Sequence, residues 1–336
     1  EFRKIPLKDL EGVQTHYNII SKNKKTVNKF FLEDLNDSLL IASATGEFRI
    51  SIDYKFDNFK KIGTNLKDLN VYELADISVI KNNIFISYTT KNNNKDCVFV
   101  SIAKANINKN NLFFELFYKE EKCTFATNGI GGRIYPYNFN NKKGFLFTTA
   151  ATGKMRDFAQ DLNSFFGKIW FFDLSTKEKN LFSSGHRNPQ GLIVFENQII
   201  STEHGPYGGD EINKINFGNN YGYPISSYGE LYSFKFEKEK FKKPLYELSK
   251  SHIEMNFEEP IFSFVPSIGI SEIERIPNDF SSYWTDNFLI TSLNGRTIYR
   301  IKFDENYNKV IYSEPMFLGE RIRDIKYINS QKMIAL

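Results

Sequence analysis

Short runs of apolar and β-branched residues recur along the chain, with clusters of turn-forming residues between them. Apolar residues at the 3.6-residue spacing of an amphipathic helix are nearly absent. The apolar runs cover residues 38–42, 47–52, 84–90, 98–103, 144–149, 168–174, 191–195, 198–202, 288–292 and 297–303. The last two flank Asn294-Gly295, a pair typical of a tight hairpin. This pattern predicts an all-β sandwich, barrel or propeller, and the number of strands favours a β-propeller.

The C-terminal residues, 333–336, have the character of an early strand in a propeller blade. A propeller closes by pairing strands from both ends of the chain, which removes exposed sheet edges. We therefore expect either that the N-terminal segment completes this blade or that natural sequence beyond Leu336 is missing. No linker rich in Pro, Gly or Ser interrupts the chain. Residues 1–336 are accordingly predicted to form a single propeller domain, complete or truncated at one or both ends.

The composition supports a large β-rich core, since hydrophobic residues make up 41% of the chain and aromatic residues 16%. The formal net charge is +4, an excess too weak to favour nucleic acid or an anionic membrane as a partner. No run approaches the ~18 apolar residues of a membrane helix, so no membrane span is expected in this chain. The first residue is Glu1 rather than Met. That start fits removal of an export signal or a membrane anchor, and it equally fits trimming.

Two cysteines, Cys97 and Cys123, are present. They form one disulfide if the protein is exported, or they are two buried thiols, and their spacing does not decide between these. The chain has no Cys-x-x-Cys or Cys/His ligand spacing, which argues against a zinc site.

Residues 185–232 contain polar residues, Gly and Pro at a higher density than strands require, which indicates long loops or a site built on loops. Asp210 and Glu211 are adjacent carboxylates in a Gly-rich turn. With backbone carbonyls in the turn around Gly205 and Pro206, they suit a hard cation such as calcium, which prefers six to eight oxygen ligands. The alternative is ordinary turn chemistry with surface acids.

Three motifs in this segment resemble the glucose/sorbosone dehydrogenase family, in its bacterial aldose sugar dehydrogenase branch. They are His186-Arg187-Asn188-Pro189-Gln190-Gly191, then Glu203-His204-Gly205-Pro206 with Gly208-Gly209-Asp210-Glu211-Ile212-Asn213, and Asn220-Tyr221-Gly222-Tyr223-Pro224. Weaker matches are 131–134, 159–163, 167–169, 266–268 and 320–324, so that the resemblance covers residues from about 70 to about 330.

The resemblance implies a six-bladed β-propeller with calcium and pyrroloquinoline quinone (PQQ) bound over the mouth of the central channel. It also implies oxidation of the anomeric carbon of an aldose and transfer of the electrons to an external acceptor. Enzymes of this type work outside the cytoplasm. We therefore expect a periplasmic or otherwise exported protein, or one anchored to a membrane through a missing N-terminal segment.

Carried over by position, the resemblance also implies site residues. The PQQ contacts are Arg187, Asn188, Gln190, Tyr232, Arg321 and Arg323, and arginine forks suit the three carboxylates of PQQ. The calcium positions are Glu211 and Tyr221 with the adjacent Asp210, and the carbonyls of Gly205 and Pro206. In the alternative interpretation Arg187 and Asn188 cap a strand corner, and the two later arginines pair with Glu320 or Asp324.

The resemblance fails at the residue that should remove the hydroxyl proton of the sugar. In the family a histidine stands a few residues before Gly-Gly-Arg; here Gly129 takes its place and Asn128 that of a neighbouring acid. Glycine cannot accept a proton. A glutamine that the family places near substrate and cofactor is not recognisable, because Val71 or Tyr72 stands there. The Gly-Asp turn of the family reads Ala-Ala-Thr-Gly-Lys at 150–154.

The histidines of this chain do not replace that base. His186 and His204 belong to the matching motifs and are expected to make structural hydrogen bonds within loops. His16 lies outside the matched region, and His252 lies in a variable loop where a rescuing role is not expected.

Two hypotheses remain open. The first is a PQQ- and calcium-dependent sugar dehydrogenase that oxidises a sugar or related alcohol with a different base, or with water as the base. The second is a non-catalytic, calcium-stabilised propeller that binds a glycan or a protein on its loop face. Tight, stoichiometric PQQ binding would separate the first from the second.

Overall fold

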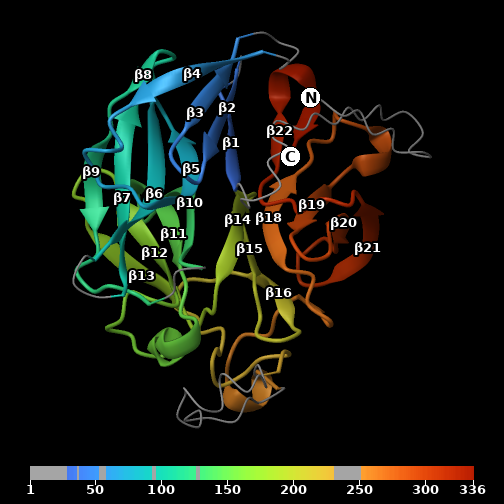
Figure 1. Ribbon diagram of the computed structural model, residues 1–336. Coiled ribbons are helices and arrows are strands. Elements are labelled where there is room, and N and C mark those ends of the chain that lie inside the picture. Colours follow the sequence, from blue (N-terminus) through green and yellow to red (C-terminus); the bar gives the residue numbers. More distant parts are fainter. Residues whose placement is uncertain (1–28, 36–37, 53–57, 93–95, 126–128, 231–250) are drawn as a thin grey trace.

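The computed structural model describes residues 29–35, 38–52, 58–92, 96–125, 129–230 and 251–336. Within these residues the chain forms antiparallel sheets arranged around a common centre (Figure 1), so the predicted all-β propeller is confirmed. The helices in the described residues are four short 3-10 turns: η1 Gly153–Ala159, η2 Ile253–Met255, η3 Ser282–Trp284 and η4 Asn329–Gln331. None of the described helices has the length and apolar character needed to cross a membrane.

Each blade is a four-stranded antiparallel sheet whose strands follow one another along the sequence, apart from β8, which pairs in parallel with β4. The first blade contains β1 Phe30–Asp34, β2 Leu39–Ser43, β3 Phe48–Ser51 and β4 Phe59–Thr64, with β8 Asn111–Leu112 added at its edge. The second contains β5 Glu73–Ile80, β6 Asn83–Lys91, β7 Val98–Asn106 and β9 Glu115–Lys119. The third contains β10 Gly131–Phe139, β11 Lys142–Thr149, β12 Lys168–Asp173 and β13 Lys179–Ser184.

Two further blades complete this series. The fourth contains β14 Pro189–Phe195, β15 Gln198–Glu203, β16 Asp210–Lys214 and β17 Phe262–Phe264. The fifth contains β18 Ile270–Arg275, β19 Asn287–Ser292, β20 Thr297–Phe303 and β21 Val310–Phe317. All ten apolar runs singled out in the sequence are found as strands, and the turn at Asn294-Gly295 joins β19 to β20.

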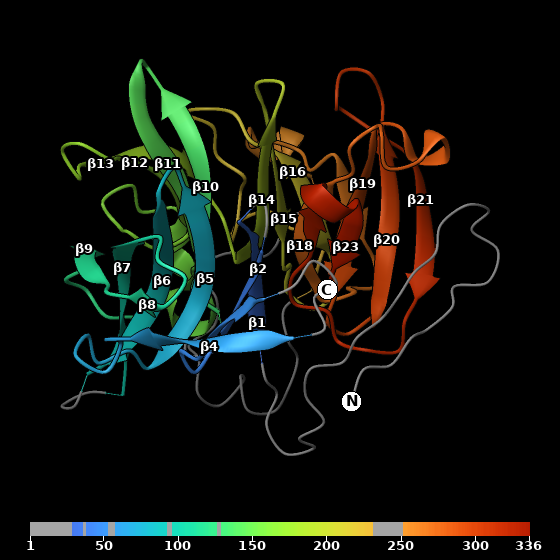
Figure 2. The same cartoon turned by 90° about the horizontal axis from the view of Figure 1, so that it is seen from above.

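The expectation of six blades was wrong, because the described residues form five. A two-stranded hairpin follows β21, made of β22 Lys326–Ile328 and β23 Met333–Ala335. It contacts β18 of the last blade and β1 of the first, so it lies where the ring closes (Figures 1 and 2). The described chain places only two strands at this point, too few for a blade. The N-terminal segment 1–28, which was one candidate to complete it, lies outside the described residues.

Aromatic packing between neighbouring blades explains the large number of Phe residues. Between the second and third blades, Phe85 and Phe145 lie 5.3 Å apart by ring centroid, and Phe145 stacks on Phe172 at 5.3 Å. All three side chains are buried. Burying an aromatic side chain stabilises a fold by about 1.5–3 kcal/mol, and each favourable ring pair adds about 0.5–1.5 kcal/mol.

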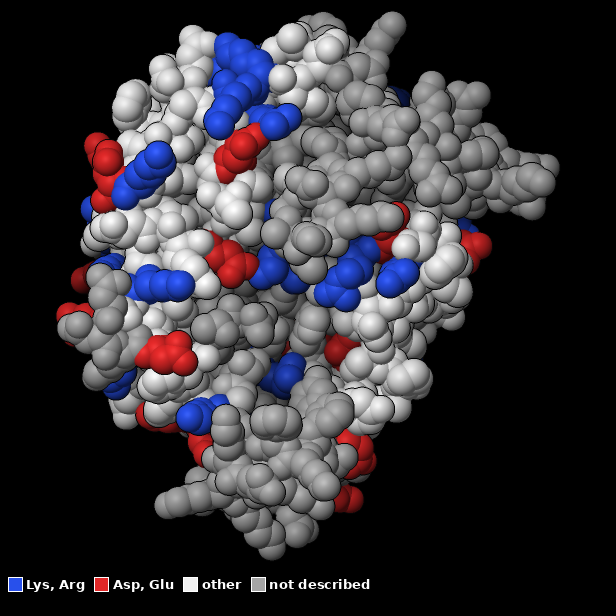
Figure 3. Space-filling view, in the orientation of Figure 1, with Lys and Arg blue, Asp and Glu red and all other residues white. Residues whose placement is uncertain are grey.

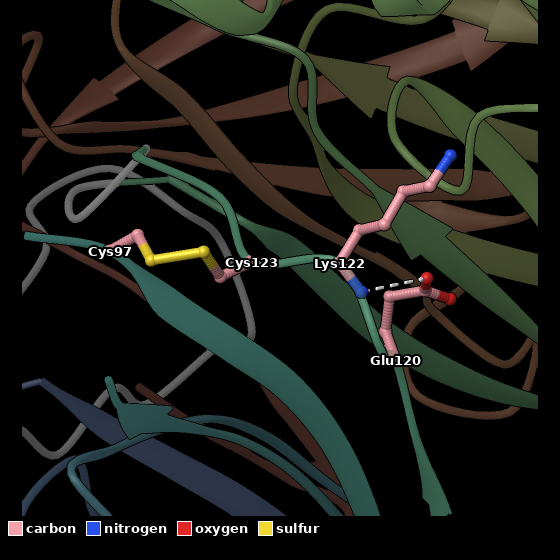
Figure 4. Close-up of a disulfide and its surroundings, with 4 residues drawn as sticks. All are labelled: Cys97, Glu120, Lys122 and Cys123. Atoms are coloured by element: carbon pink, nitrogen blue, oxygen red, sulfur yellow. Dashed lines mark hydrogen bonds between the residues drawn. A yellow bond between two sulfur atoms is a disulfide. The ribbon is translucent and has the colours of Figure 1, made fainter. Parts of the chain in front are cut away.

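The two cysteines are joined in a disulfide, which decides between the alternatives that the sequence left open. Cys97 directly precedes β7, and Cys123 lies in the connection between β9 and β10 (Figure 4). Thr124 pairs with Val98 through two backbone hydrogen bonds beside the bridge. The disulfide and this pairing therefore hold residues 123–124 against the start of β7.

Candidate functional site

A cavity opens where the inner strands meet near the centre of the ring. It is lined by Lys29, Phe31, Glu73, Leu74, Ala75, Thr89, Gly129, Ile130, Gly131, Arg133, Gln190 and Arg323. These residues come from β1, β5, β6, β10, β14 and the connection to β22, or lie just before those strands. The enclosed part measures about 50 Å³, so a planar ring system would lie across its mouth rather than inside it. In Figure 3, Lys and Arg side chains gather near the middle of the face shown.

Arg133 lines this cavity and also a second one, the central channel between the inner strands. Its side chain therefore lies between the two spaces. Its guanidinium lies 2.7 Å from a carboxylate oxygen of Asp76, 2.6 Å from Glu272 and 3.3 Å from Asp324. Its Nε also donates to the backbone carbonyl of Gln190 at 2.5 Å. The three carboxylates raise the pKa of Arg133 despite its burial, so the guanidinium is a permanent cation in the centre of the ring.

Arg323, Gln190 and Asn188 form a chain of polar side chains. Arg323 donates to Gln190 Oε1 at 2.6 Å, and Gln190 Nε2 donates to Asn188 Oδ1 at 2.9 Å. The Nε of Arg323 is buried and has no hydrogen-bond partner. Burial and the charges of Arg133 and Arg321 lower the pKa of Arg323 to about 10. An unpartnered guanidinium NH with neighbouring positive charge is suited to an anionic ligand.

Arg187 directly precedes Asn188, just before β14 begins at Pro189. It donates to the carbonyl of His204 at 2.8 Å, and its guanidinium lies 6.0 Å from the ring centroid of Tyr223. The charges of Arg187 and Arg323 both act on His204, whose pKa falls to about 4, mainly through burial. The structure therefore brings together four of the residues predicted for the cofactor, Arg187, Asn188, Gln190 and Arg323.

One of the predicted cofactor residues is placed differently, and one is not described. Arg321 is exposed, and its guanidinium donates to the carbonyl of Leu293 at 3.4 Å. It acts electrostatically on Arg323 but does not line the cavity. Tyr232 lies outside the described residues.

Buried oxygen atoms gather beside this polar chain on the fourth blade. Glu203, Glu211 and Ser263 form a row across β15, β16 and β17, since Glu211 pairs with both of the others. Burial and the neighbouring Glu203, Asp210 and Glu259 raise the pKa of Glu211 to about 8. Asn213 donates to Glu211 at 3.2 Å, and neither Asn213 Oδ1 nor Ser263 Oγ has a hydrogen-bond partner. Carboxylates that repel one another beside unpartnered oxygens are suited to a hard cation.

Other residues predicted for the metal have structural contacts. Asp210 accepts hydrogen bonds from the backbone NH groups of Gly205, Ile268 and Ile270 at 2.9–3.1 Å, which ties two loops together. The Tyr221 hydroxyl donates to the Lys214 carbonyl at 2.6 Å and accepts from an amide, and its ring stacks on His186. Pro206 packs its ring against Gly229. In the described part of the chain no group of three or more His, Cys, Asp or Glu side chains is arranged to hold a metal by itself.

Gly205 occurs where no other residue fits, because a Cβ there would lie 1.9 Å from the Gly209 carbonyl oxygen. This crowding folds the Gly-Pro segment tightly against the loop that precedes Asp210. The tight turn explains why Gly is required in this motif and brings the loop to the side of the site.

Gly129, which takes the place of the expected histidine, does line the cavity. A Cβ at this position would lie 2.7 Å from Asn188 Nδ2. Asn188 Oδ1 also accepts a hydrogen bond from Gly131 NH at 3.2 Å, so the amide occupies the space where a side chain at 129 would begin. The neighbouring Asn128 lies outside the described residues.

The described histidines do not reach the cavity. His186 is fully buried and bonded to Ser183 and to Glu203, as a structural role predicts. His204 Nε2 is buried without a partner. His252 is buried between Tyr228 and Glu259, away from the cavity lining.

Among the polar residues of the cavity that sequence reasoning missed are Lys29 and Glu73, which form an ion pair at its mouth. Neither Val71 nor Tyr72 lines the cavity, although both were considered for the position of the family's glutamine. Val71 packs against the core of the first blades, and Tyr72 is exposed with Lys91 over its ring. The pairing register of β5 shifts between Leu74 and Asp76, so the strand pattern gave no signal that Glu73 faces the cavity.

Comparisons with known proteins agree with this geometry. The family model described as Glucose / Sorbosone dehydrogenase matches residues 73–333. Aldose sugar dehydrogenase YliI of Escherichia coli K12 is 31% identical over 230 residues, which are 63% of this chain and 58% of that protein. Quinoprotein glucose dehydrogenase B of Acinetobacter calcoaceticus is 27% identical over 143 residues, which are 41% of this chain and 26% of that protein. The matched region thus spans little more than half of the first relative and about a quarter of the second.

Solved structures share the fold. The apo-form soluble aldose sugar dehydrogenase from Escherichia coli superposes with a TM-score of 0.70 at 22% identity, covering 90% of each chain. The PQQ-bound aldose sugar dehydrogenase from Streptomyces coelicolor gives 0.66 at 17% identity, covering 89% of this chain and 85% of that one. Because the family model covers well over half of the chain, this protein belongs to the glucose/sorbosone dehydrogenase family.

Proposed function

We propose that this protein is a PQQ-dependent dehydrogenase that oxidises the anomeric carbon of an aldose or a related alcohol. The observation that carries the proposal is the polar chain Arg323–Gln190–Asn188 at the cavity mouth, with an unpartnered guanidinium NH. Its position at the mouth of the central cavity supports this use, since Gln190 and Arg323 both line that cavity.

The residues present fit PQQ. Arg323 and Arg187 would hold its carboxylates, because guanidinium forks bind carboxylates through two parallel hydrogen bonds. Asn188 and Gln190 would contact its polar edge. When bound, PQQ supplies a quinone that accepts a hydride from the anomeric carbon. The protein residues then orient the sugar and keep water from the reacting atoms.

Calcium is the second proposed ligand, held beside the cofactor by Glu211 and by carbonyls of the Gly205-Pro206 turn. The raised pKa of Glu211 and the unpartnered oxygens of Asn213 and Ser263 support a cation at this side of the site. A divalent ion would keep Glu211 charged and would act on the quinone as a Lewis acid.

The experiment is PQQ titration of the purified protein with calcium and with a chelator, followed by aldose-dependent dye reduction. We expect stoichiometric binding that needs calcium, and dye reduction with at least one aldose. Arg323→Gln should weaken PQQ binding about 10–100-fold, as loss of a charge-assisted hydrogen bond predicts. Arg49→Gln, a change in a surface ion pair of the first blade, is the matched control. Absence of PQQ binding by the wild-type protein contradicts the proposal.

A non-catalytic propeller that binds a glycan or a protein is the second candidate. The observation in its favour is Gly129, which lines the cavity but offers no base, with Asn188 against it. PQQ binding without sugar-dependent dye reduction would favour this candidate.

We also propose that the protein works outside the cytoplasm, with an external electron acceptor. The Cys97–Cys123 disulfide supports this location, because disulfides persist in oxidising compartments. Fractionation of the source cells would test it, and recovery with cytoplasmic markers would contradict it.

A further inference from the structure

The cavity contains one carboxylate among its lining residues, Glu73 at the start of β5. The side chain is partly exposed, at 27%, and points into a mouth whose other charged residues are Lys29, Arg133 and Arg323. A carboxylate is a competent proton acceptor, and the other charged side chains that line this cavity are all cationic.

The ammonium of Lys29 forms an ion pair with Glu73 Oε1. The backbone around Glu73 is fixed as well: Leu74 NH donates to the Ala44 carbonyl at 2.8 Å and Tyr72 NH to the Thr89 carbonyl at 2.8 Å. The carboxylate is therefore held at the mouth by both its side chain and its backbone. Its charge also acts on Arg323, which places it within electrostatic reach of the proposed cofactor residues.

The place of the expected histidine is closed. Asn188 Nδ2 lies 2.7 Å from where a side chain at position 129 would begin, and its amide is bonded to Gly131 and Gln190. Glu73 and Gly129 line the same cavity, so a base lost at one wall can be supplied from another residue of that cavity.

We propose that Glu73 is the proton acceptor of the sugar oxidation, in place of a histidine. This inference rests on the proposed function. In the step, the O–H bond at the anomeric carbon breaks and its proton passes to a Glu73 oxygen. The C–H bond breaks and the hydrogen leaves with two electrons as hydride to the quinone oxidant, while a C=O bond forms and the aldose becomes a lactone. Glu73 then releases the proton to solvent.

The test compares the wild-type protein with Glu73→Gln after loading with PQQ and calcium. The first readout is PQQ affinity by titration, which we expect to stay within about threefold, because Glu73 is not a proposed cofactor contact. The second is quinone reduction by an aldose in a single turnover, which should slow about 10²–10⁴-fold, as loss of a general base predicts. Glu73→Asp should recover part of this rate. Glu47→Gln, which changes a similar exposed ion pair, should match the wild type.

The rate against pH gives a third readout that a merely structural residue would not change. The wild type and Glu73→Gln should differ in how the rate depends on pH, because only the wild type carries the proposed proton acceptor. Glu73→Gln with PQQ bound and a wild-type rate overturns the assignment while the proposed function stands. Loss of PQQ binding in Glu73→Gln also overturns it, because Glu73 would then hold the cofactor. PQQ binding by the wild type without sugar-dependent reduction contradicts both proposals.

Discussion

At the scale of single residues, the side chain of Asn188 limits which residues fit at position 129 in the cavity wall. Its Oδ1 accepts hydrogen bonds from Gly131 NH and Gln190 Nε2, and its backbone NH donates to Glu203 at 3.2 Å. These contacts hold the amide against Gly129. The Asn188 amide therefore occupies the space that a side chain at position 129 would need, and glycine fits there because it has no side chain.

This packing predicts the outcome of Gly129→His. The new side chain should displace the Asn188 amide and break its bond to Gly131, which lowers stability by about 1 kcal/mol and weakens PQQ binding. Turnover should not rise. Urea denaturation and PQQ titration measure the two effects.

The control is the double variant Gly129→His with Asn188→Ala, compared with Asn188→Ala alone. Removing the amide makes room, so the added histidine should cost little stability in that background. An equal loss of stability in both backgrounds would show that crowding by Asn188 is not the cause.

The motif residues of the site could be predicted from the sequence, but their partners could not. Arg187, Asn188 and Gln190 are adjacent in one motif, and their order alone indicated a polar loop. The contact between Arg323 and Gln190 joins residues 133 positions apart. Glu73 was missed because a single acid at the start of a strand has no local signal that separates it from a surface charge.

At the scale of elements, the ten apolar runs all correspond to strands, but three inner strands that carry a charge at the ring centre are among those that the runs missed. β6, β11 and β19 are almost wholly buried and read as apolar runs. The inner strands β5, β10 and β18 were not singled out, because Asp76, Arg133 and Glu272 interrupt their apolar pattern. Those charges are buried against one another at the ring centre, a compensation that only the assembled blades provide.

The disulfide between Cys97 and Cys123 carries a prediction at this scale. It closes a loop across 26 residues and joins the start of β7 to the segment that follows β9. Loop-closure entropy predicts that its removal lowers the free energy of unfolding by about 3–4 kcal/mol. The Cys97→Ser, Cys123→Ser double variant should therefore unfold at a lower urea concentration than the wild type.

A matched control uses the wild type with and without a reductant. The reduced wild type should reproduce the midpoint of the double variant, and the reductant should leave the variant unchanged. The backbone pairing of Val98 with Thr124 remains in each case, so we expect native-like circular dichroism before unfolding. A midpoint unaffected by reduction would contradict a stabilising role for the bridge.

At the scale of the whole molecule, the central channel contains more acids than bases. Its cavity of about 270 Å³ is lined by five carboxylates, Glu33, Asp76, Glu272, Glu274 and Asp324, and by two cations, Arg133 and Lys326. At least one of these charges lies on each inner strand except β14, and Asp324 lies just before β22. The number of blades could not be predicted from the sequence, because no repeat period was visible. Without knowing which inner strands are neighbours, the partners of these buried charges could not be predicted either.

Burial, with the neighbouring acids as a smaller cause, raises the pKa values of several of these carboxyl groups. Burial is the main cause for Asp76 and Glu274, whose pKa values rise to about 7, and for Glu272, whose pKa rises to about 8. Burial likewise raises the pKa of Glu33. The folded protein therefore binds more protons than the unfolded chain between the ordinary carboxyl pKa and pH 7–8, and these groups stabilise the fold less as the pH rises through that range.

These shifts predict that the free energy of unfolding falls between pH 6.5 and pH 8, and that Glu274→Gln reduces the fall by about 1 kcal/mol. His204, whose lowered pKa of about 4 has the opposite effect, acts mainly below pH 6.5 and is outside this range. Calcium should be present throughout, because Glu211 would otherwise add a fall of the same sign. Urea denaturation at both pH values gives the measurement, with the exposed Glu115→Gln as control. If the free energy of unfolding of Glu274→Gln falls as much as that of the wild type, Glu274 is not a source of this pH dependence.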